Sequence, residues 1–206
     1  GRVIKTTAAD GAFSTNAYDA AGRLESVTDA LGNTTSYVYD ELGNNIKVTD
    51  SLGNATSYTY DSNNRRISST DALGHKSVFI YDLNSNLTDT ILPDSTPSDL
   101  SDNPIMSVDY DARSRKISEM DLAGSITHFE YNPDGLITAV IDSLGNRTEY
   151  SYDQRGNKIS QKDAKGNITS WAYNALSQLV THTLPEGQSQ SFDYDAVGNQ
   201  ISKTDF

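Results

Sequence analysis

The sequence repeats itself every 21 residues, and this period limits the fold more than any other feature. Nine tyrosines mark the repeat, and each is followed by aspartate or asparagine. These anchor tyrosines are Tyr18, Tyr39, Tyr60, Tyr81, Tyr110, Tyr131, Tyr152, Tyr173 and Tyr194. Their spacing is 21 residues throughout, except for 29 residues between Tyr81 and Tyr110. A fixed period of this length is typical of arrays in which one supersecondary unit is used many times.

Two columns of glycine follow the same register. Four residues after the anchor stand Gly22, Gly43, Gly135, Gly156 and Gly198, with Asn64, Ser85, Ser114 and Ser177 in the other repeats. Fourteen residues after it stand Gly32, Gly53, Gly74, Gly124, Gly145, Gly166 and Gly187. Many of these glycines are the fourth residue of the motif D-x-x-G-N, as in residues 40–44 and 50–54. Aspartate opens a type I turn by accepting bonds from its own backbone, and glycine supplies the left-handed residue of the following bulge.

The segments between the turns alternate like strands. Residues 35–40 place Tyr37 and Tyr39 on one face and Val38 on the other, and residues 45–50 place Ile46 and Val48 on one face. Each repeat therefore predicts a two-stranded antiparallel unit, and the chain is expected to be all-β with about eighteen strands and no helix. An open twisted sheet rarely exceeds about ten strands. The prediction is a curled or spiralling β-sheet wall, either a shell or a coiled ribbon.

Composition excludes several classes of partner. The net charge of −12 argues against nucleic acid, which needs clustered lysine and arginine, and against docking on an anionic membrane. No apolar run approaches the roughly 20 residues that a membrane-spanning helix requires. The chain has no cysteine, so disulfides cannot stabilise it.

The titratable residues predict no catalytic, cofactor-binding or metal site. The turn aspartates could bind calcium, but caps of their own turns are the simpler interpretation. His75, His128 and His182 fall in three different columns, so the repeat does not stack them into a zinc site. No cysteine nucleophile or G-x-S-x-G motif is present, although a glycosidase-type carboxylate pair stays open.

Three surface features each have a structural and a functional interpretation. Five asparagines open glycosylation sequons, although a turn explains most of them without glycans; they are Asn33, Asn54, Asn86, Asn146 and Asn167. The tyrosine columns and Trp171 form either a half-buried ladder or a sugar-stacking platform. Residues 91–106 break the register and hold three of the five prolines, which predicts a solvated loop or a contact loop.

The phrase G-x-x-x-x-Y-x-Y-D-x-x-G-N-x-I-x-x-x-T-D-x-x-G resembles the Tyr-Asp (YD) repeat of RHS (rearrangement hotspot) proteins. Similar repeats build the shells of insecticidal toxin complexes and teneurins. The resemblance covers residues 1–206 and implies a β-sheet that spirals into a shell, in many members around a toxic C-terminal domain. No Asp-Pro-containing core-terminating motif and no effector domain are found here, so the resemblance does not carry over the toxin role.

We therefore expect residues 1–206 to be one YD-repeat array, a segment of a longer array that begins and stops mid-repeat. Its expected function is non-enzymatic: a structural scaffold in a secreted or cell-surface protein of bacterial origin, without cofactors. Two alternatives stay open, an extracellular fibre assembled end to end and an adhesion or carbohydrate-binding surface. The expected partners are neighbouring repeats of the same or identical chains, with an enclosed effector domain or a surface glycan as further possibilities.

Overall fold

The protein is described by a computed structural model that covers residues 2–7, 13–94 and 102–206. The described residues form nineteen β-strands and no helix, which confirms the all-β prediction. The chain divides into two compact units, Gly1–Ser107 (unit 1) and Val108–Phe206 (unit 2). Within the described residues, no helix is present that could cross a membrane.

The strands are five or six residues long, apart from the last. Those of unit 1 are β1 (Arg2–Thr7), β2 (Phe13–Tyr18), β3 (Leu24–Thr28), β4 (Thr34–Tyr39), β5 (Asn45–Thr49), β6 (Ala55–Tyr60), β7 (Arg66–Thr70), β8 (Lys76–Tyr81) and β9 (Leu87–Ile91). The boundary between the units falls in β10 (Ile105–Tyr110). Those of unit 2 are β11 (Lys116–Met120), β12 (Ile126–Tyr131), β13 (Ile137–Ile141), β14 (Arg147–Tyr152), β15 (Lys158–Lys162), β16 (Ile168–Tyr173), β17 (Leu179–Thr183), β18 (Ser189–Tyr194) and β19 (Gln200–Lys203).

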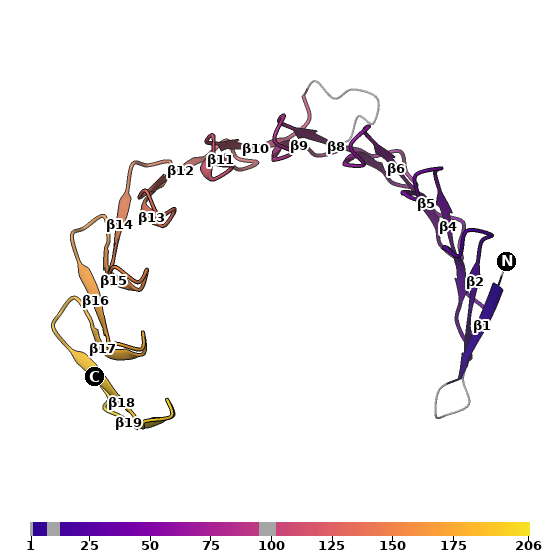
Figure 1. Ribbon diagram of the computed structural model, residues 1–206. Coiled ribbons are helices and arrows are strands. Elements are labelled where there is room, and N and C mark those ends of the chain that lie inside the picture. Colours follow the sequence, from indigo (N-terminus) through magenta and orange to yellow (C-terminus); the bar gives the residue numbers. More distant parts are fainter. Residues whose placement is uncertain (1, 8–12, 95–101) are drawn as a thin grey trace. The chain divides into compact units, whose positions relative to one another are not determined.

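Within each unit, consecutive strands pair antiparallel and follow one another as hairpins (Figure 1). Every anchor tyrosine is the last residue of an even-numbered strand, from Tyr18 in β2 to Tyr194 in β18. The 21-residue period is therefore one strand, one turn, one strand and a second turn. Within each unit, the turns that follow an anchor, here called the YD turns, lie where the even-numbered strands end, along one edge of the sheet. The turns that follow odd-numbered strands, the TD turns, lie along the opposite edge of that unit.

The turns have the predicted conformation. In the turn after β4, the Gly43 N–H donates to the Asp40 carbonyl at 3.2 Å, and the Asp40 N–H donates to the Asn44 carbonyl at 3.0 Å. The glycine columns have positive φ, as Gly145 does at 81°. Where the first glycine column is replaced, the substitutes also have positive φ; they are Asn64, Ser85, Ser114 and Ser177. Left-handed backbone, rather than glycine itself, is what the turn requires.

The YD hairpins contain a second bulge that sequence analysis did not predict. Tyr39 pairs with Asn45 and Val38 pairs with Lys47, so Ile46 is an extra residue in β5. The same shift recurs in other hairpins that follow an anchor, as between β14 and β15. Such a bulge re-aims the side chains of its strand. It therefore brings the position six residues after the anchor onto the face that carries the tyrosines.

The sheet has little core within the described residues. Ala139 is the only apolar residue there that is fully buried, and Ser68 and Asn103 are the buried polar residues. Tyr37 and Tyr39 are half-buried and Val38 is 47% exposed, as the alternation predicted. This agrees with the low apolar content of 35%, which cannot fill a thick interior.

The insertion is shorter than its predicted bounds of about 91–106. Ile91 belongs to β9, and Ile105 and Met106 belong to β10, where they pair with Ile91 and Thr90. The Leu92 N–H donates to the Pro104 carbonyl at 2.9 Å, and Asn103 Nδ2 donates to the Leu92 carbonyl at 2.7 Å. Ladder bonds thus continue into the predicted loop, because apolar strand residues stand at both of its ends. Residues 95–101 lie outside the described residues.

Candidate functional site

Each turn aspartate is engaged by its own turn. In the turn after β13, Asp142 Oδ1 accepts the backbone N–H groups of Leu144 at 2.9 Å and Asn146 at 2.8 Å. Asp142 Oδ2 accepts Asn146 Nδ2 at 2.7 Å. These bonds stabilise the ionised carboxylate, with the Asn146 amide the largest cause, and they hold the Asp142 pKa below its ordinary value. The carboxylate is a structural acceptor in a fixed geometry.

This arrangement favours the turn interpretation over calcium. Three N–H donors already occupy the Asp142 oxygens, whereas calcium needs six to eight oxygen ligands around one point. Among the described residues, no group of three or more histidines, cysteines or acids is placed to hold a metal. That no metal stabilises the fold stays a prediction.

Thermal unfolding tests that prediction directly. The melting midpoint with excess EDTA is expected to equal the midpoint with added calcium, because the turn carboxylates are satisfied by N–H donors. Circular dichroism at neutral pH would measure both. A large rise in the midpoint that depends on calcium concentration would show that the aspartate columns bind the ion.

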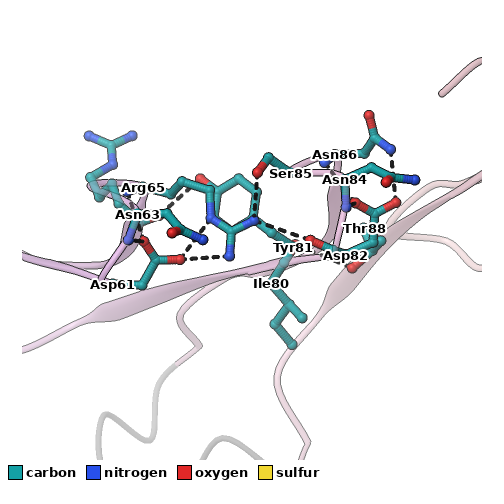
Figure 2. A network of polar contacts seen from close by, with 11 residues as sticks. Asp61, Asn63, Arg65, Ile80, Tyr81, Asp82, Asn84, Ser85, Asn86 and Thr88 are labelled. Atoms are coloured by element: carbon teal, nitrogen blue, oxygen red, sulfur yellow. Dashed lines mark hydrogen bonds and ion pairs between the residues drawn. The ribbon is translucent and has the colours of Figure 1, made fainter.

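Arginines join successive YD turns along one edge of the sheet. Arg65 forms an ion pair with Asp61 at 2.7 Å inside its own turn. Its Nη1 also donates to the Asp82 carbonyl and to Ser85 Oγ in the next YD turn, both at 3.1 Å. Its guanidinium lies 4.7 Å from the centroid of the Tyr81 ring. Figure 2 shows Arg65 between the two turns, while Ile80 points away from the network.

The same position, five residues after the anchor, serves this purpose in other repeats. Arg23 and Arg115 repeat the ion pair and the carbonyl contact of Arg65, reaching the carbonyls of Asp40 and Asn132 respectively. Asn44 Nδ2 donates to Asn64 Oδ1 at 3.0 Å, and Gln178 Nε2 donates to the Gly198 carbonyl at 3.3 Å. We call this column the turn ladder. Sequence analysis missed it, although the prevalence of arginine, asparagine and glutamine in the column was a usable signal.

Anchor tyrosines join repeats through their hydroxyls. The Tyr152 hydroxyl donates to the Ile137 carbonyl at 2.8 Å, and Tyr39 and Tyr131 make the equivalent bonds to Leu24 and Lys116. The acceptor always lies 15 residues earlier, directly before the extra residue of the preceding repeat's bulge. A bulge disrupts the local ladder. Each hydroxyl therefore binds a carbonyl at the point where strand pairing is interrupted.

We expect Tyr152→Phe to lower the free energy of unfolding by about 1 kcal/mol, because it leaves the Ile137 carbonyl without this donor. Burial raises the Tyr152 pKa above its ordinary value, which marks a partly desolvated hydroxyl. Tyr150→Phe is the matched control, since the Tyr150 hydroxyl makes no hydrogen bond among the described residues. Urea unfolding of both variants measures the difference, and equal losses would contradict the role of the anchor hydroxyl.

A second aromatic column stands two residues before seven of the nine anchors, and cations lie over five of its rings. Arg66 lies 5.5 Å from the centroid of the Tyr58 ring and 5.0 Å from that of Phe79. Lys158 lies 5.5 Å from the Tyr150 centroid and 4.3 Å from that of Trp171. Both cations occupy the position that the second bulge turns onto this face.

Trp171 is also stacked on a cross-strand neighbour. Its ring lies 5.5 Å from that of His182, with an angle of 6° between the planes. Trp171 is half-buried, and its contacts with His182 and Lys158 use ring surface that a sugar would need. The geometry favours the half-buried ladder over an open sugar-stacking platform.

The histidines and the sequon asparagines have local partners. His75 Nδ1 lies 2.9 Å from Asp71 Oδ2 in its own turn. His128 lies in β12 and His182 in β17, with four strands between them along the chain. Asn33, Asn54, Asn146 and Asn167 are exposed and donate their amides to the aspartate that opens the turn. The turn thus accounts for these four asparagines, as predicted.

Comparisons with known proteins agree with this geometry. A family model described as Teneurin YD-shell matches residues 2–203. The crystal structure of TcdB2-TccC3-TEV aligns with a TM-score of 0.72 and 15% identity over 97% of this chain and 12% of that chain. The TcdB2-TccC3-Cdc42 structure gives 0.72 and 16% over the same shares.

A third solved structure, the Photorhabdus luminescens Tc holotoxin pore, gives a TM-score of 0.56 and 15% identity over 97% of this chain and 15% of that chain. At these identities the likeness shows the fold. The chain spans about an eighth of the first two chains that it matches. No curated protein sequence matches it significantly.

Proposed function

The chain belongs to the teneurin YD-shell family, and from this premise we propose that it is a wall segment of a β-sheet shell. Its role is that of a non-enzymatic scaffold in a secreted or cell-surface bacterial protein. The cargo is an effector domain within the same larger protein, as the resemblance to toxin-associated YD shells suggests. Neighbouring repeats are its direct partners, and the charge of −12 disfavours nucleic acid and anionic membranes.

The proposal rests on one observation, which is that the polar side chains bind groups in neighbouring repeats. Turn-ladder side chains bind groups 17 or 20 residues away, and anchor hydroxyls bind carbonyls 15 residues away. All of these partners are in the next or the preceding repeat. The side chains that a binding protein would present to a ligand are here used to hold repeat against repeat.

The carboxylates support a scaffold rather than catalysis. A general acid in a glycosidase needs a carboxyl whose pKa is raised so that it keeps its proton near neutral pH. Twelve turn aspartates have lowered pKa values, and that of Asp111 is held at about 2, chiefly by the Arg115 side chain. They are therefore ionised at neutral pH and engaged as acceptors.

Electron microscopy of the complete natural protein that contains this sequence, with limited proteolysis, tests the proposal. A closed hollow particle is expected, with a segment that resists protease until the β-sheet unfolds. Open filaments that lengthen when salt is added would contradict the shell and support the alternative of an extracellular fibre. Glycan binding that is lost in Trp171→Ala would replace it by the carbohydrate-binding alternative, and turnover that depends on a turn aspartate would overturn the non-enzymatic role.

A further inference from the structure

Three leucines project from successive TD turns of unit 1. Leu31, Leu52 and Leu73 are 88%, 85% and 77% exposed. Each is the third residue of its turn, and each backbone N–H donates to the turn aspartate at 2.9 Å. The three turns share one geometry, so the side chains leave the sheet edge from equivalent points. We call these residues the leucine row.

The row has a regular spacing. The turns of Leu31, Leu52 and Leu73 connect β3 to β4, β5 to β6 and β7 to β8, and these strands pair consecutively. Neighbouring strands lie about 4.8 Å apart, so turns two strands apart are separated by about 10 Å. The row is therefore a line of apolar tips along one edge.

The fold does not need leucine at this position. The equivalent residues in unit 2 are Ala123, Leu144, Lys165 and Glu186, so unit 2 has a single leucine there and no row, although its turns make the same backbone bonds. At the opposite edge of unit 1, the third turn residues are Ala21, Leu42, Asn63 and Asn84, which form no such row. Exposed single leucines are common, but a regular line of them is typical of an interaction surface.

Charge selects the kind of partner. The turns that carry the row, residues 29–33, 50–54 and 71–75, contain Asp29, Asp50 and Asp71 and no lysine or arginine. Those carboxylates are held at the edge by their own turns. A second copy of the chain would bring the same anionic edge and a net charge of −12. A cationic, apolar partner is complementary.

Spacing selects the partner's conformation. Residues seven apart on an α-helix lie on one face and about 10.5 Å apart along its axis, which matches the row. Residues on one face of a β-strand repeat every 6–7 Å, which does not. We propose that the leucine row binds a basic amphipathic helix of a partner polypeptide, with its apolar residues seven apart along the row and its lysines or arginines beside the turn aspartates.

A synthetic peptide tests the proposal on the chain as it is. The probe is a helical peptide of about three heptads, with leucine at every seventh position and lysine at the flanking positions. A scrambled peptide of the same composition keeps its charge but loses the apolar line. Fluorescence anisotropy at low salt should show tighter binding of the patterned peptide, and added salt should weaken it.

The triple variant Leu31→Ser, Leu52→Ser, Leu73→Ser is expected to bind the patterned peptide at least about tenfold more weakly. The matched control is Leu42→Ser with Leu83→Ser, which removes exposed leucines from turns at the opposite edge and should bind like the wild type. Far-ultraviolet circular dichroism confirms that each variant is folded. Equal binding by the triple variant, or equal binding of the scrambled peptide, would overturn the proposal. Self-association that the triple variant abolishes would assign the row to a second copy instead.

Discussion

Lowering the pH is expected to leave the chain's stability unchanged down to about pH 5 and to unfold it cooperatively below about pH 4. The cause is the repeated use of one carboxylate geometry. Twelve turn aspartates have pKa values below the ordinary value; they are Asp19, Asp29, Asp40, Asp50, Asp61, Asp71, Asp82, Asp111, Asp142, Asp153, Asp163 and Asp195.

The direction of these pKa shifts determines how the stability of the fold changes with pH. A carboxyl with a lowered pKa in the folded state binds a proton more readily when the chain is unfolded, so acid favours unfolding. Its contribution is complete above the unfolded pKa of about 3.9 and is lost as the pH falls through the folded pKa. For Asp111 that loss extends to about pH 2. Each exposed aspartate by itself contributes little to the free energy of unfolding. The summed loss in acid is large because many turns titrate together.

A variant with fewer titrating turns is the control. Asp142→Asn with Asp163→Asn should still fold at neutral pH, because asparagine opens two natural turns, where Asn132 Oδ1 accepts the Leu136 N–H and Asn174 Oδ1 accepts the Leu176 N–H. Its urea-unfolding free energy should fall less steeply as the pH is lowered from about 5 to about 4. An identical slope in the variant and the wild type would show that these aspartates do not drive acid unfolding.

Gly145→Val is expected to cost about 1–3 kcal/mol of unfolding free energy, the largest effect among the single substitutions considered. Gly145 has a φ of +81°, and an added Cβ would meet no heavy atom within 4 Å. The cost therefore comes from the strained backbone conformation and not from crowding by neighbouring atoms. A β-branched residue tolerates this left-handed backbone poorly.

Two further substitutions separate the backbone effect from the side chain. Ser143→Val, in the same turn, should change stability by no more than about 0.5 kcal/mol, since it is a surface position. Gly145→Asn should cost less than Gly145→Val, because Asn64 already adopts a φ of 60° in an equivalent turn. Urea midpoints measure all three. Equal, small losses for the two valine variants would refute a conformational role of the glycine.

The amino-acid sequence by itself determined the features that depend on a few neighbouring residues. The turn after β13 illustrates this: its bonds join Asp142 to Leu144, Gly145 and Asn146, all within five residues. The alternation that half-buries Tyr37 and exposes Val38 is equally local. Because these preferences repeat every 21 residues, the strand positions and the family resemblance followed from the pattern alone.

Only the tertiary structure decided which residues meet between repeats. The extra residue Ile46 shifts the register of β5, and a register cannot be read from turn signals when a bulge adds one residue. The equivalent shift in β7, where Ile67 is the extra residue, decides which side chains share a face with the tyrosines, so it places Arg66 between Tyr58 and Phe79. The contacts of Arg65 with the next turn and of Tyr152 with Ile137 depend in the same way on strand pairing across repeats. Turn bonds are set by the local chain, whereas these contacts arise only after separate hairpins have paired.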